Sequence, residues 1–347
     1  MASDATASDV VPQHFSIVAL ETIFTGLPPI TVPAPHTFTL TTYERSTAAE
    51  VGPRLRDAAA DIAIITTVPV RGDALDPANT PKLKLISAIA SGTDTIDLAA
   101  CKKRGIRVLN SPGCNIDAVA EHAVSLYFAC RRRIVPSMTA LQRGDWPKKG
   151  TLMHTAMTGG NAAVRRCATE TVALVGYGAV GKRVAELLRA LGMHVLVTAR
   201  KGATGSLPNG RVAFEDAIRK ATLVVLCCPR THETLNLLST PELNVMQPDC
   251  LVVNVSRGGI VNEQALLEAL QTSKIGGAGV DVFGVEPAGP ETSPLLTSEV
   301  ASSDLNLVVT PHTAWVAAQT TANNHQVLVE NINGFVSGSV NPDRIRA

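Results

Sequence analysis

Residues 171–181 of the chain read TVALVGYGAVG. A short apolar run of strand length is followed by a Gly-x-Gly-x-x-Gly motif, and the motif opens a segment with helical periodicity. The first glycine permits a tight turn, the second lets backbone N–H groups approach a pyrophosphate, and the third allows close helix–strand packing. The helix N-terminus adds the positive end of a dipole. This context predicts a dinucleotide site that includes Gly176, Tyr177, Gly178, Ala179, Val180 and Gly181.

Apolar runs of strand length continue on both sides of this motif. We predict six strands in one unit, at residues 172–175, 195–198, 223–228, 251–255, 278–282 and 307–310, with helices at 181–191 and 262–271. Alternating strands and helices with right-handed crossovers describe a doubly wound, Rossmann-type α/β unit. Before it, strands at 16–20, 38–42, 62–66, 85–89 and 107–110 alternate with helical stretches and predict a first α/β unit. A helix over 117–133 follows, and a last helix over 317–334 is expected to pack back on the first unit.

The composition excludes several classes of function. The chain has 347 residues, and its 31 Lys and Arg balance 30 Asp and Glu. This balance argues against nucleic acid or an anionic membrane as a partner, and no apolar run approaches the ~18 residues of a membrane span. The first basic residue is Arg45, so we expect no secretory or transit signal and a cytoplasmic protein. The seven cysteines form no Cys-x-x-Cys pair, which predicts reduced thiols and no metal site.

In a doubly wound dinucleotide-binding unit, the residue at the end of the second strand contacts the adenosine ribose. A carboxylate there binds the 2′-hydroxyl of NAD, yet no Asp or Glu occurs between Glu186 and Glu215. Arg200 and Lys201 stand at this strand end instead. Two cations suit a 2′-phosphate, so we predict that NADP is preferred and that NAD binds at lower affinity. The alternative is that both residues belong to a solvated turn.

Three isolated polar residues follow strands of the same unit: Arg257, Glu286 and His312. Reacting groups in open α/β sheets gather at the carboxyl ends of the strands. A guanidinium can bind a carboxylate and a carbonyl oxygen, and a histidine can transfer a proton near neutral pH. The three residues together predict one catalytic cleft, in which Glu286 orients His312.

At these residues the sequence resembles the D-isomer-specific 2-hydroxyacid dehydrogenase family. The resemblance runs from about residue 60 through SGTDTID (91–97), NSPG (110–113), AEHA (120–123), GYGAVG, NVSRGGIVNE (254–263) and the Pro311-His312 pair. The segment PHTAW (311–315) is similar to the glyoxylate and hydroxypyruvate reductase branch, and Glu286 differs from the Gln of formate dehydrogenases. The resemblance implies a Rossmann domain at 118–317 and a smaller, discontinuous flavodoxin-like substrate domain at 1–117 and 318–347.

The resemblance also implies roles for individual residues. It makes Arg257, Glu286 and His312 the catalytic residues, and it places Ser91, Gly92 and Arg257 at the substrate carboxylate. It places Thr231, Asn254 and Asp281 at the cofactor, together with Cys228, Pro229, Val255, Ser256, His312 and Ala314. Residues 134–170, which we expect to be irregular, contain Arg143-Gly144-Asp145-Trp146 and resemble the arm through which members form homodimers.

The sequence therefore predicts an NADP(H)-dependent enzyme that reduces a small 2-oxo acid, of the glyoxylate or hydroxypyruvate type, to the D-2-hydroxy acid. Two alternatives stay open. The first is a reductase of a bulkier 2-oxo acid, with Val68, Val70, Trp146 and Trp315 as candidate walls of an apolar pocket. The second is a dinucleotide-sensing interaction protein without significant turnover.

Overall fold

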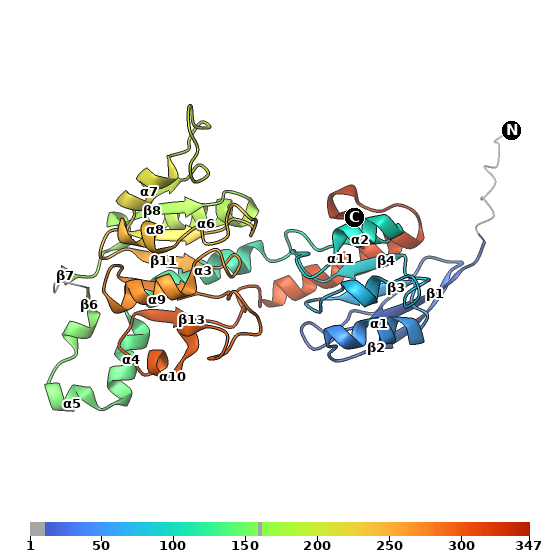
Figure 1. The fold of residues 1–347 in the computed structure, drawn as a ribbon, viewed down its shortest axis with the longest axis horizontal. Helices are drawn as coiled ribbons and strands as arrows, with labels where there is room; N and C mark the ends of the chain where they lie inside the picture. Colours follow the sequence, from blue (N-terminus) through green and yellow to red (C-terminus); the bar gives the residue numbers. More distant parts are fainter. Residues whose placement is uncertain (1–10, 159–161) are drawn as a thin grey trace. The chain divides into compact units, whose positions relative to one another are not determined.

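The computed structural model describes residues 11–158 and 162–347. It divides into two compact α/β units: one contains the described residues up to Asn115 together with Ala317–Ala347, and the other runs from Ile116 to Val316 (Figure 1). The predicted fold class, two parallel sheets covered by helices, is confirmed. No helix in the described ranges is long and apolar enough to cross a bilayer.

The first unit has a five-stranded parallel sheet with the order β2-β1-β3-β4-β5. One face packs on α1 (Ala48–Asp57) and α2 (Leu98–Arg104), where Val51, Leu55 and Cys101 are buried. The other face packs on α11 (Ala318–Val336), whose Leu328 and Ile332 are buried against the sheet. Helical packing on both faces explains why β3 and β4 are buried along their whole length, whereas the edge strand β2 is largely exposed. The strands are β1 (His14–Ala19), β2 (Thr37–Thr42), β3 (Ile62–Ile65), β4 (Leu85–Ala88) and β5 (Arg107–Leu109).

The second unit has a six-stranded parallel sheet with the order β13-β12-β11-β10-β8-β9. On one face lie α3 (Ile116–Arg131) and α6 (Ala179–Ala190), with Leu126 and Val184 in the core. On the other lie α7 (Phe214–Lys220), α8 (Thr240–Asn244) and α9 (Glu263–Gln271). The helix α10 (Ser298–Ala301) is short. The strands are β8 (Thr171–Val175), β9 (His194–Val197), β10 (Leu223–Leu226), β11 (Leu251–Asn254), β12 (Gly277–Val280) and β13 (Leu307–Val309).

The segment after α3 departs from the irregular insert that the sequence suggests. The helix predicted to reach residue 133 ends at Arg131, because Arg133 takes a left-handed conformation with φ of 50°. A new helix α4 (Ile134–Gln142) starts there, followed by α5 (Asp145–Lys149) and a short antiparallel pair, β6 (Met157–Thr158) and β7 (Ala162–Ala163). Residues 159–161 of the predicted arm lie outside the described residues. The apolar spacing of Ile134, Met138 and Leu141 explains the helix α4.

Candidate active site

The glycine motif forms the turn between β8 and α6 in the second unit. A Cβ atom placed on Gly181 would lie 2.2 Å from the carbonyl oxygen of Gly176, so close helix–turn packing requires glycine there. Gly178 differs, because no described atom lies within 4 Å of a Cβ built on it. Protein packing therefore does not demand a glycine at residue 178, whereas a pyrophosphate approaching the backbone does. The motif fits NAD(P) at the N-terminus of α6.

The other residues predicted to contact the cofactor lie at the same edge of this sheet. The sheet changes strand order at β8, which has β9 on one side and β10 on the other. Ligands of open α/β sheets bind outside the carboxyl ends of the strands at such a point. The predicted residues follow β10, β11, β12 and β13, respectively: Cys228, Pro229 and Thr231; Val255 and Ser256; Asp281; His312 and Ala314.

The two cations after β9 differ in their surroundings. The Arg200 side chain is 88% exposed, and its Nη1 atom lies 3.6 Å from Oε2 of Glu233. In contrast, Nζ of Lys201 lies 2.8 Å from Oε1 of Glu242 and donates a hydrogen bond to the Leu237 carbonyl oxygen at 3.2 Å. Lys201 is thus held by its own unit, which leaves Arg200 as the more accessible cation.

Arg211 is a third cation in this region that no sequence motif indicates. Its guanidinium lies 5.1 Å from the ring centre of Tyr177 in the glycine motif. One of its amino groups also donates to the Thr198 carbonyl oxygen, at 3.1 Å. Arg211 stands eleven residues after Arg200 and returns beside β9, where Val212 forms a parallel bridge with Thr198. Arg211 is therefore placed by tertiary contacts across the loop after β9, which the sequence alone does not show.

The predicted catalytic residues of the second unit converge. Nδ1 of His312 lies 2.6 Å from Oε2 of Glu286, and the Phe283 N–H donates to Oε1 of the same carboxylate at 2.9 Å. Burial raises the pKa of Glu286, but the hydrogen bonds from His312 and Phe283 and the charges of His312 and Arg257 outweigh it. The pKa of Glu286 therefore lies below its ordinary value. Glu286 is an ionised partner for His312.

Arg257 is held in place by the turn after β11. The Asn254 side chain donates to the Arg257 carbonyl oxygen at 3.1 Å, and one Arg257 amino group donates to the Ser256 carbonyl oxygen at 2.8 Å. A Cβ atom on Gly258 would lie 1.7 Å from the Phe283 carbonyl oxygen. Glycine at residue 258 therefore lets the Arg257 turn approach the segment that leads to Glu286.

Asp281 organises the loop that carries His312. Its side chain is fully buried, and it accepts hydrogen bonds from the Thr310 hydroxyl at 2.6 Å and the backbone N–H groups of Thr313 and Ala314 at 2.9 and 3.0 Å. Its carbonyl oxygen accepts from the His312 N–H at 2.8 Å. The resemblance suggests that Asp281 contacts the cofactor. Its hydrogen bonds give it a second role, because they fix the backbone around His312.

His122, which the sequence shows only as part of the AEHA segment, joins this network from α3. Its Nε2 atom lies 2.9 Å from Oγ1 of Thr310 and 3.5 Å from Oδ1 of Asp281. Because the Thr310 hydroxyl proton is directed to Asp281, the His122 ring must be the donor to Thr310. No sequence pattern links a helix residue to a strand end so far along the chain.

The predicted substrate residues Ser91 and Gly92 follow β4 in the first unit. The Ser91 hydroxyl donates to the Ser111 carbonyl oxygen at 3.0 Å and to Oδ1 of Asn115 at 3.1 Å. The Asn110 side chain donates to the Ser91 carbonyl oxygen at 2.7 Å. The loop is thus fixed at its start. Val68 and Val70 are buried in the core of this unit.

The chemistry of the site is that of hydride and proton transfer. Within the described ranges, no group of His, Cys, Asp and Glu has the arrangement of a metal site, and all seven cysteines are free thiols. A glycine loop for a dinucleotide and an Arg, Glu and His at the same sheet edge define an NAD(P)-dependent oxidoreductase.

Comparisons with known proteins identify the family. The NAD-binding domain of D-isomer specific 2-hydroxyacid dehydrogenases matches residues 124–314. The glycerate dehydrogenase of Methylorubrum extorquens is 38% identical over 294 residues, which cover 84% of this chain and 87% of that protein. The glyoxylate reductase of Thermococcus litoralis is 31% identical over 286 residues, which cover 82% and 83%. The chain therefore belongs to the D-isomer specific 2-hydroxyacid dehydrogenase family, as its resemblance indicates, and is an oxidoreductase acting on CH–OH groups with NAD(P).

A solved structure supports the fold independently. The NADPH-dependent glyoxylate/hydroxypyruvate reductase of Sinorhizobium meliloti superimposes with a TM-score of 0.75 at 23% identity. The match covers 96% of this chain and 98% of that one. At this identity the comparison establishes the two-unit fold alone.

Proposed function

We propose that this enzyme uses NADPH in preference to NADH to reduce a small 2-oxo acid, of the glyoxylate or hydroxypyruvate type, to the D-2-hydroxy acid. The observation that carries the proposal is the 2.6 Å contact between His312 and Glu286, in a unit whose glycine loop fits a dinucleotide. The names of the relatives, glycerate dehydrogenase and glyoxylate reductase, support this substrate class.

Each residue has one task in the proposed reaction. Arg257 binds the substrate through its planar donor fork, which polarises the carbonyl and holds the carboxylate. Backbone N–H groups at Ser91 and Gly92 hold the same carboxylate. His312, as imidazolium, donates a proton to the carbonyl oxygen, and Glu286 keeps the ring oriented and balances its charge. The nicotinamide, when bound, supplies the hydride.

The preference for NADPH rests on the cations around the end of β9. Arg200 is the accessible guanidinium after this strand, and Arg211 lies over Tyr177 at the start of the cofactor loop. We assign the 2′-phosphate to Arg200, with Arg211 as the nearby second cation. Lys201, held by Glu242, contributes positive potential rather than a direct contact. NAD lacks the 2′-phosphate and binds at lower affinity.

Turnover of different 2-oxo acids distinguishes a small substrate from the bulkier alternative. The test is oxidation of NADPH in the presence of glyoxylate, hydroxypyruvate and a branched 2-oxo acid such as 2-oxoisocaproate. We expect kcat/KM to be highest with one of the two small acids. Highest kcat/KM with the branched acid would overturn the substrate assignment, and turnover of none would favour a dinucleotide-sensing interaction protein.

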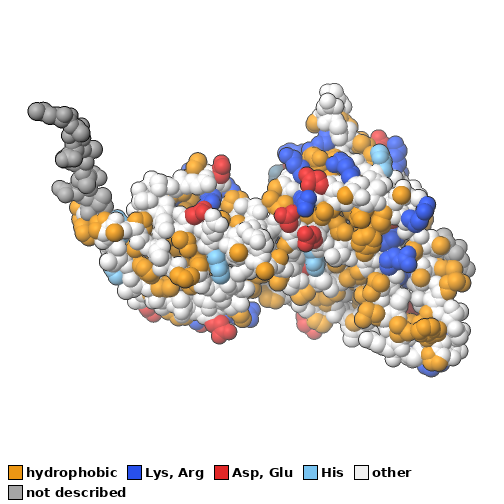
Figure 2. Space-filling model, turned by 180° about the vertical axis from the view of Figure 1, so that it is seen from behind, with side chains coloured by type: hydrophobic (Ala, Val, Ile, Leu, Met, Phe, Trp, Pro, Cys, Tyr) orange, Lys and Arg blue, Asp and Glu red, His pale blue; other side chains and the backbone are white. Residues whose placement is uncertain are grey.

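We also propose that the enzyme is a homodimer, with α4 and α5 in its interface. One face of α4 exposes Ile134, Val135, Met138 and Leu141, each between 38% and 52% exposed, and Trp146 of α5 is 56% exposed. Figure 2 shows hydrophobic side chains on the surface of this arm, at the lower right. A row of large apolar side chains on one helix is typical of a surface that another chain covers.

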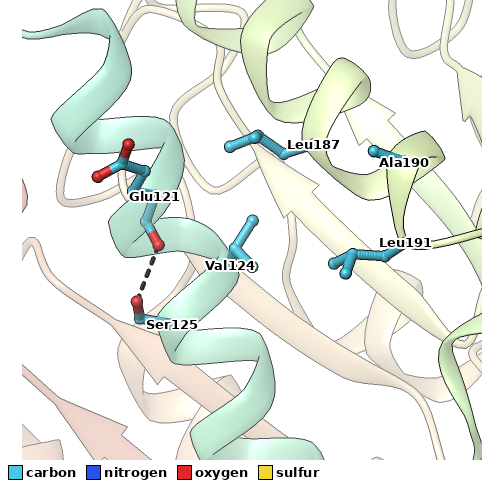
Figure 3. Close-up of a pocket in the computed structure, with 6 residues that line it drawn as sticks. All are labelled: Glu121, Val124, Ser125, Leu187, Ala190 and Leu191. Atoms are coloured by element: carbon cyan, nitrogen blue, oxygen red, sulfur yellow. Dashed lines mark hydrogen bonds between the residues drawn. The ribbon is translucent and has the colours of Figure 1, made fainter.

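A groove between α3 and α6 offers further apolar surface on the same unit. In Figure 3 the side chains of Val124, Leu187 and Leu191 point toward one another across it. The backbone beside it is held by a hydrogen bond from the Ser125 hydroxyl to the Glu121 carbonyl oxygen, at 2.9 Å. We include this groove in the surface that a second copy covers.

A further inference from the structure

Glu21 lies where the sheet of the first unit changes strand order. The central pair is β1 and β3, since β2 lies beyond β1 and β4 lies beyond β3. Glu21 follows the end of β1 by two residues and is only 5% exposed. In open α/β sheets the crevice at this point is the usual place for a ligand. The first unit therefore places a buried carboxylate at the position where such sheets bind a ligand.

The Glu21 carboxylate is bound by the segment that follows β3. Its Oε2 atom accepts three backbone N–H hydrogen bonds, from Thr66 at 3.0 Å and from Thr67 and Val68 at 2.7 Å each. Its Oε1 atom accepts from the Thr67 hydroxyl at 2.7 Å. Successive backbone N–H groups that converge on one point form an anion site. Here the anion is a side chain of the same unit, so the site serves to fix the loop.

The fixed segment is joined to the loop that contains Ser91 and Gly92. Two residues after Val68, the Val70 N–H donates to the Thr95 carbonyl oxygen at 3.0 Å, and the Asp97 N–H donates to the Val70 carbonyl oxygen at 3.1 Å. The Arg71 guanidinium donates to the same Thr95 carbonyl oxygen, at 3.3 Å, and to that of Asp94. Hydrogen bonds therefore connect the segment after residues 66–68 directly to residues 94–97.

We propose that Glu21 is a positioning residue of the substrate site, which holds the Ser91–Gly92 loop in its binding geometry through residues 66–71. This inference rests on the proposed function, because it assigns the substrate carboxylate to that loop. Binding groups that shift by a fraction of an ångström lose much of their effect. Weakening the Glu21 contacts should therefore affect the 2-oxo acid and leave the dinucleotide, bound by the second unit, unaffected.

The test compares Glu21→Gln with Glu44→Gln, an exposed glutamate of the same unit. A Gln amide can still offer its oxygen to the three N–H groups and its NH2 group to Thr67, so the shape is kept and the charge is lost. We expect the KM for the preferred 2-oxo acid to rise about fivefold in Glu21→Gln, since hydrogen bonds to a charged acceptor are the stronger ones. The dissociation constant of NADPH, measured by fluorescence without substrate, should stay the same. Glu44→Gln should match the wild type.

Hydrogen exchange of the Thr66, Thr67 and Val68 amides gives a readout that needs no turnover. We expect faster exchange at these amides in Glu21→Gln than in Glu44→Gln. If the wild type is active and Glu21→Gln has the same KM as the wild type, the proposed role of Glu21 is overturned and the proposed function is not. This holds whatever the exchange rates are. Equal losses of substrate and NADPH binding would also overturn it, because they indicate general unfolding. A wild type that reduces no 2-oxo acid would instead overturn the proposed function.

Discussion

His312 and Glu286 approach each other to 2.6 Å although they follow different strands, β13 and β12. His312 holds this position with a left-handed backbone, at φ of 54°. Such a conformation costs a non-glycine residue about 1–3 kcal/mol and persists only where surrounding contacts impose it. The contacts here are those of Asp281, which fixes Thr310, Thr313 and Ala314 around His312. The ring is thus oriented before substrate arrives.

The ionised state of Glu286 predicts a change in pH dependence on neutralisation. Its pKa lies below the ordinary value, so Glu286 is negatively charged at neutral and mildly acidic pH and stabilises the protonated ring. In Glu286→Gln the negative charge beside the His312 ring is lost. The decline of kcat/KM for reduction, measured from about pH 5 to about pH 9, should therefore move to lower pH. Glu291→Gln, an exposed neighbour, is the control, and identical profiles for both variants would rule out the pairing as functional.

Arg200 is expected to determine the preference for NADPH. A hydrogen bond to a charged group contributes about 1.5–3 kcal/mol, and solvent screening reduces this for a side chain so exposed. Arg200→Ala should therefore weaken NADPH binding about tenfold and leave NADH nearly unchanged. Calorimetric titration with both nucleotides measures this, with Arg189→Ala as an exposed control on α6.

A double substitution at the same site tests whether the cofactor preference can be reversed. Ala199→Asp combined with Arg200→Ala supplies a carboxylate for the ribose hydroxyls and removes the phosphate partner, so the preference should reverse toward NADH. If Arg200→Ala weakened both nucleotides alike, Arg200 would have no part in the discrimination.

A buried ion pair is expected to determine the stability of the second unit. Nε of Arg131 lies 2.6 Å from Oε1 of Glu170, and the two side chains are only 1% and 0% exposed. Glu170→Gln leaves the buried guanidinium without its counter-charge, at a cost of about 3 kcal/mol in the free energy of unfolding. Both tryptophans, Trp146 and Trp315, lie in this unit, so tryptophan fluorescence during urea unfolding reports on it.

Replacing both charged residues by apolar ones tests whether the unit needs the charges of Arg131 and Glu170 or only side chains that fill the same space. Arg131→Met together with Glu170→Leu should recover most of the stability lost in Glu170→Gln, because no buried charge remains. Glu268→Gln, at an exposed position on α9, should unfold like the wild type. Equal stabilities of Glu170→Gln and Glu268→Gln would contradict the assignment.

The proposed dimer predicts a response to charge on α4. Met138→Glu with Leu141→Glu places two carboxylates in the apolar face and should give a monomer at micromolar concentration in analytical ultracentrifugation. Ile23→Glu makes the same kind of change at a 51% exposed site of the first unit and should leave the dimer intact. A monomeric wild type would overturn the proposal.

Much of the fold is predictable from the sequence because most of its inner strands are short, fully buried apolar runs. The predicted strand at 62–66 and the observed β3 (Ile62–Ile65) differ by only one residue. This strand could be predicted because all four of its side chains are buried between helices. The polar residues after the strands were found by the same logic, because the sheet edge brings Arg257, Glu286 and His312 together.

The supporting contacts could not be predicted because they join residues far apart in the chain. Arg131 follows the apolar stripe of a helix, and only the fold places it against Glu170 and the carbonyl oxygens of Thr222 and Asp249. Arg165 likewise pairs with Asp249, which lies far along the chain. Glu21 and His122 likewise have partners that no local pattern indicates.

The most direct test of the central claim is the turnover number of His312→Asn in the reduction of the preferred 2-oxo acid. Asparagine tolerates the left-handed conformation of residue 312 and keeps a polar side chain, but it cannot donate a proton near neutral pH. We predict a kcat lower by about 10²–10⁴-fold than in the wild type, the range of general acid–base catalysis, with NADPH binding unchanged. A folded variant that binds NADPH normally and keeps a near-normal kcat would contradict the account.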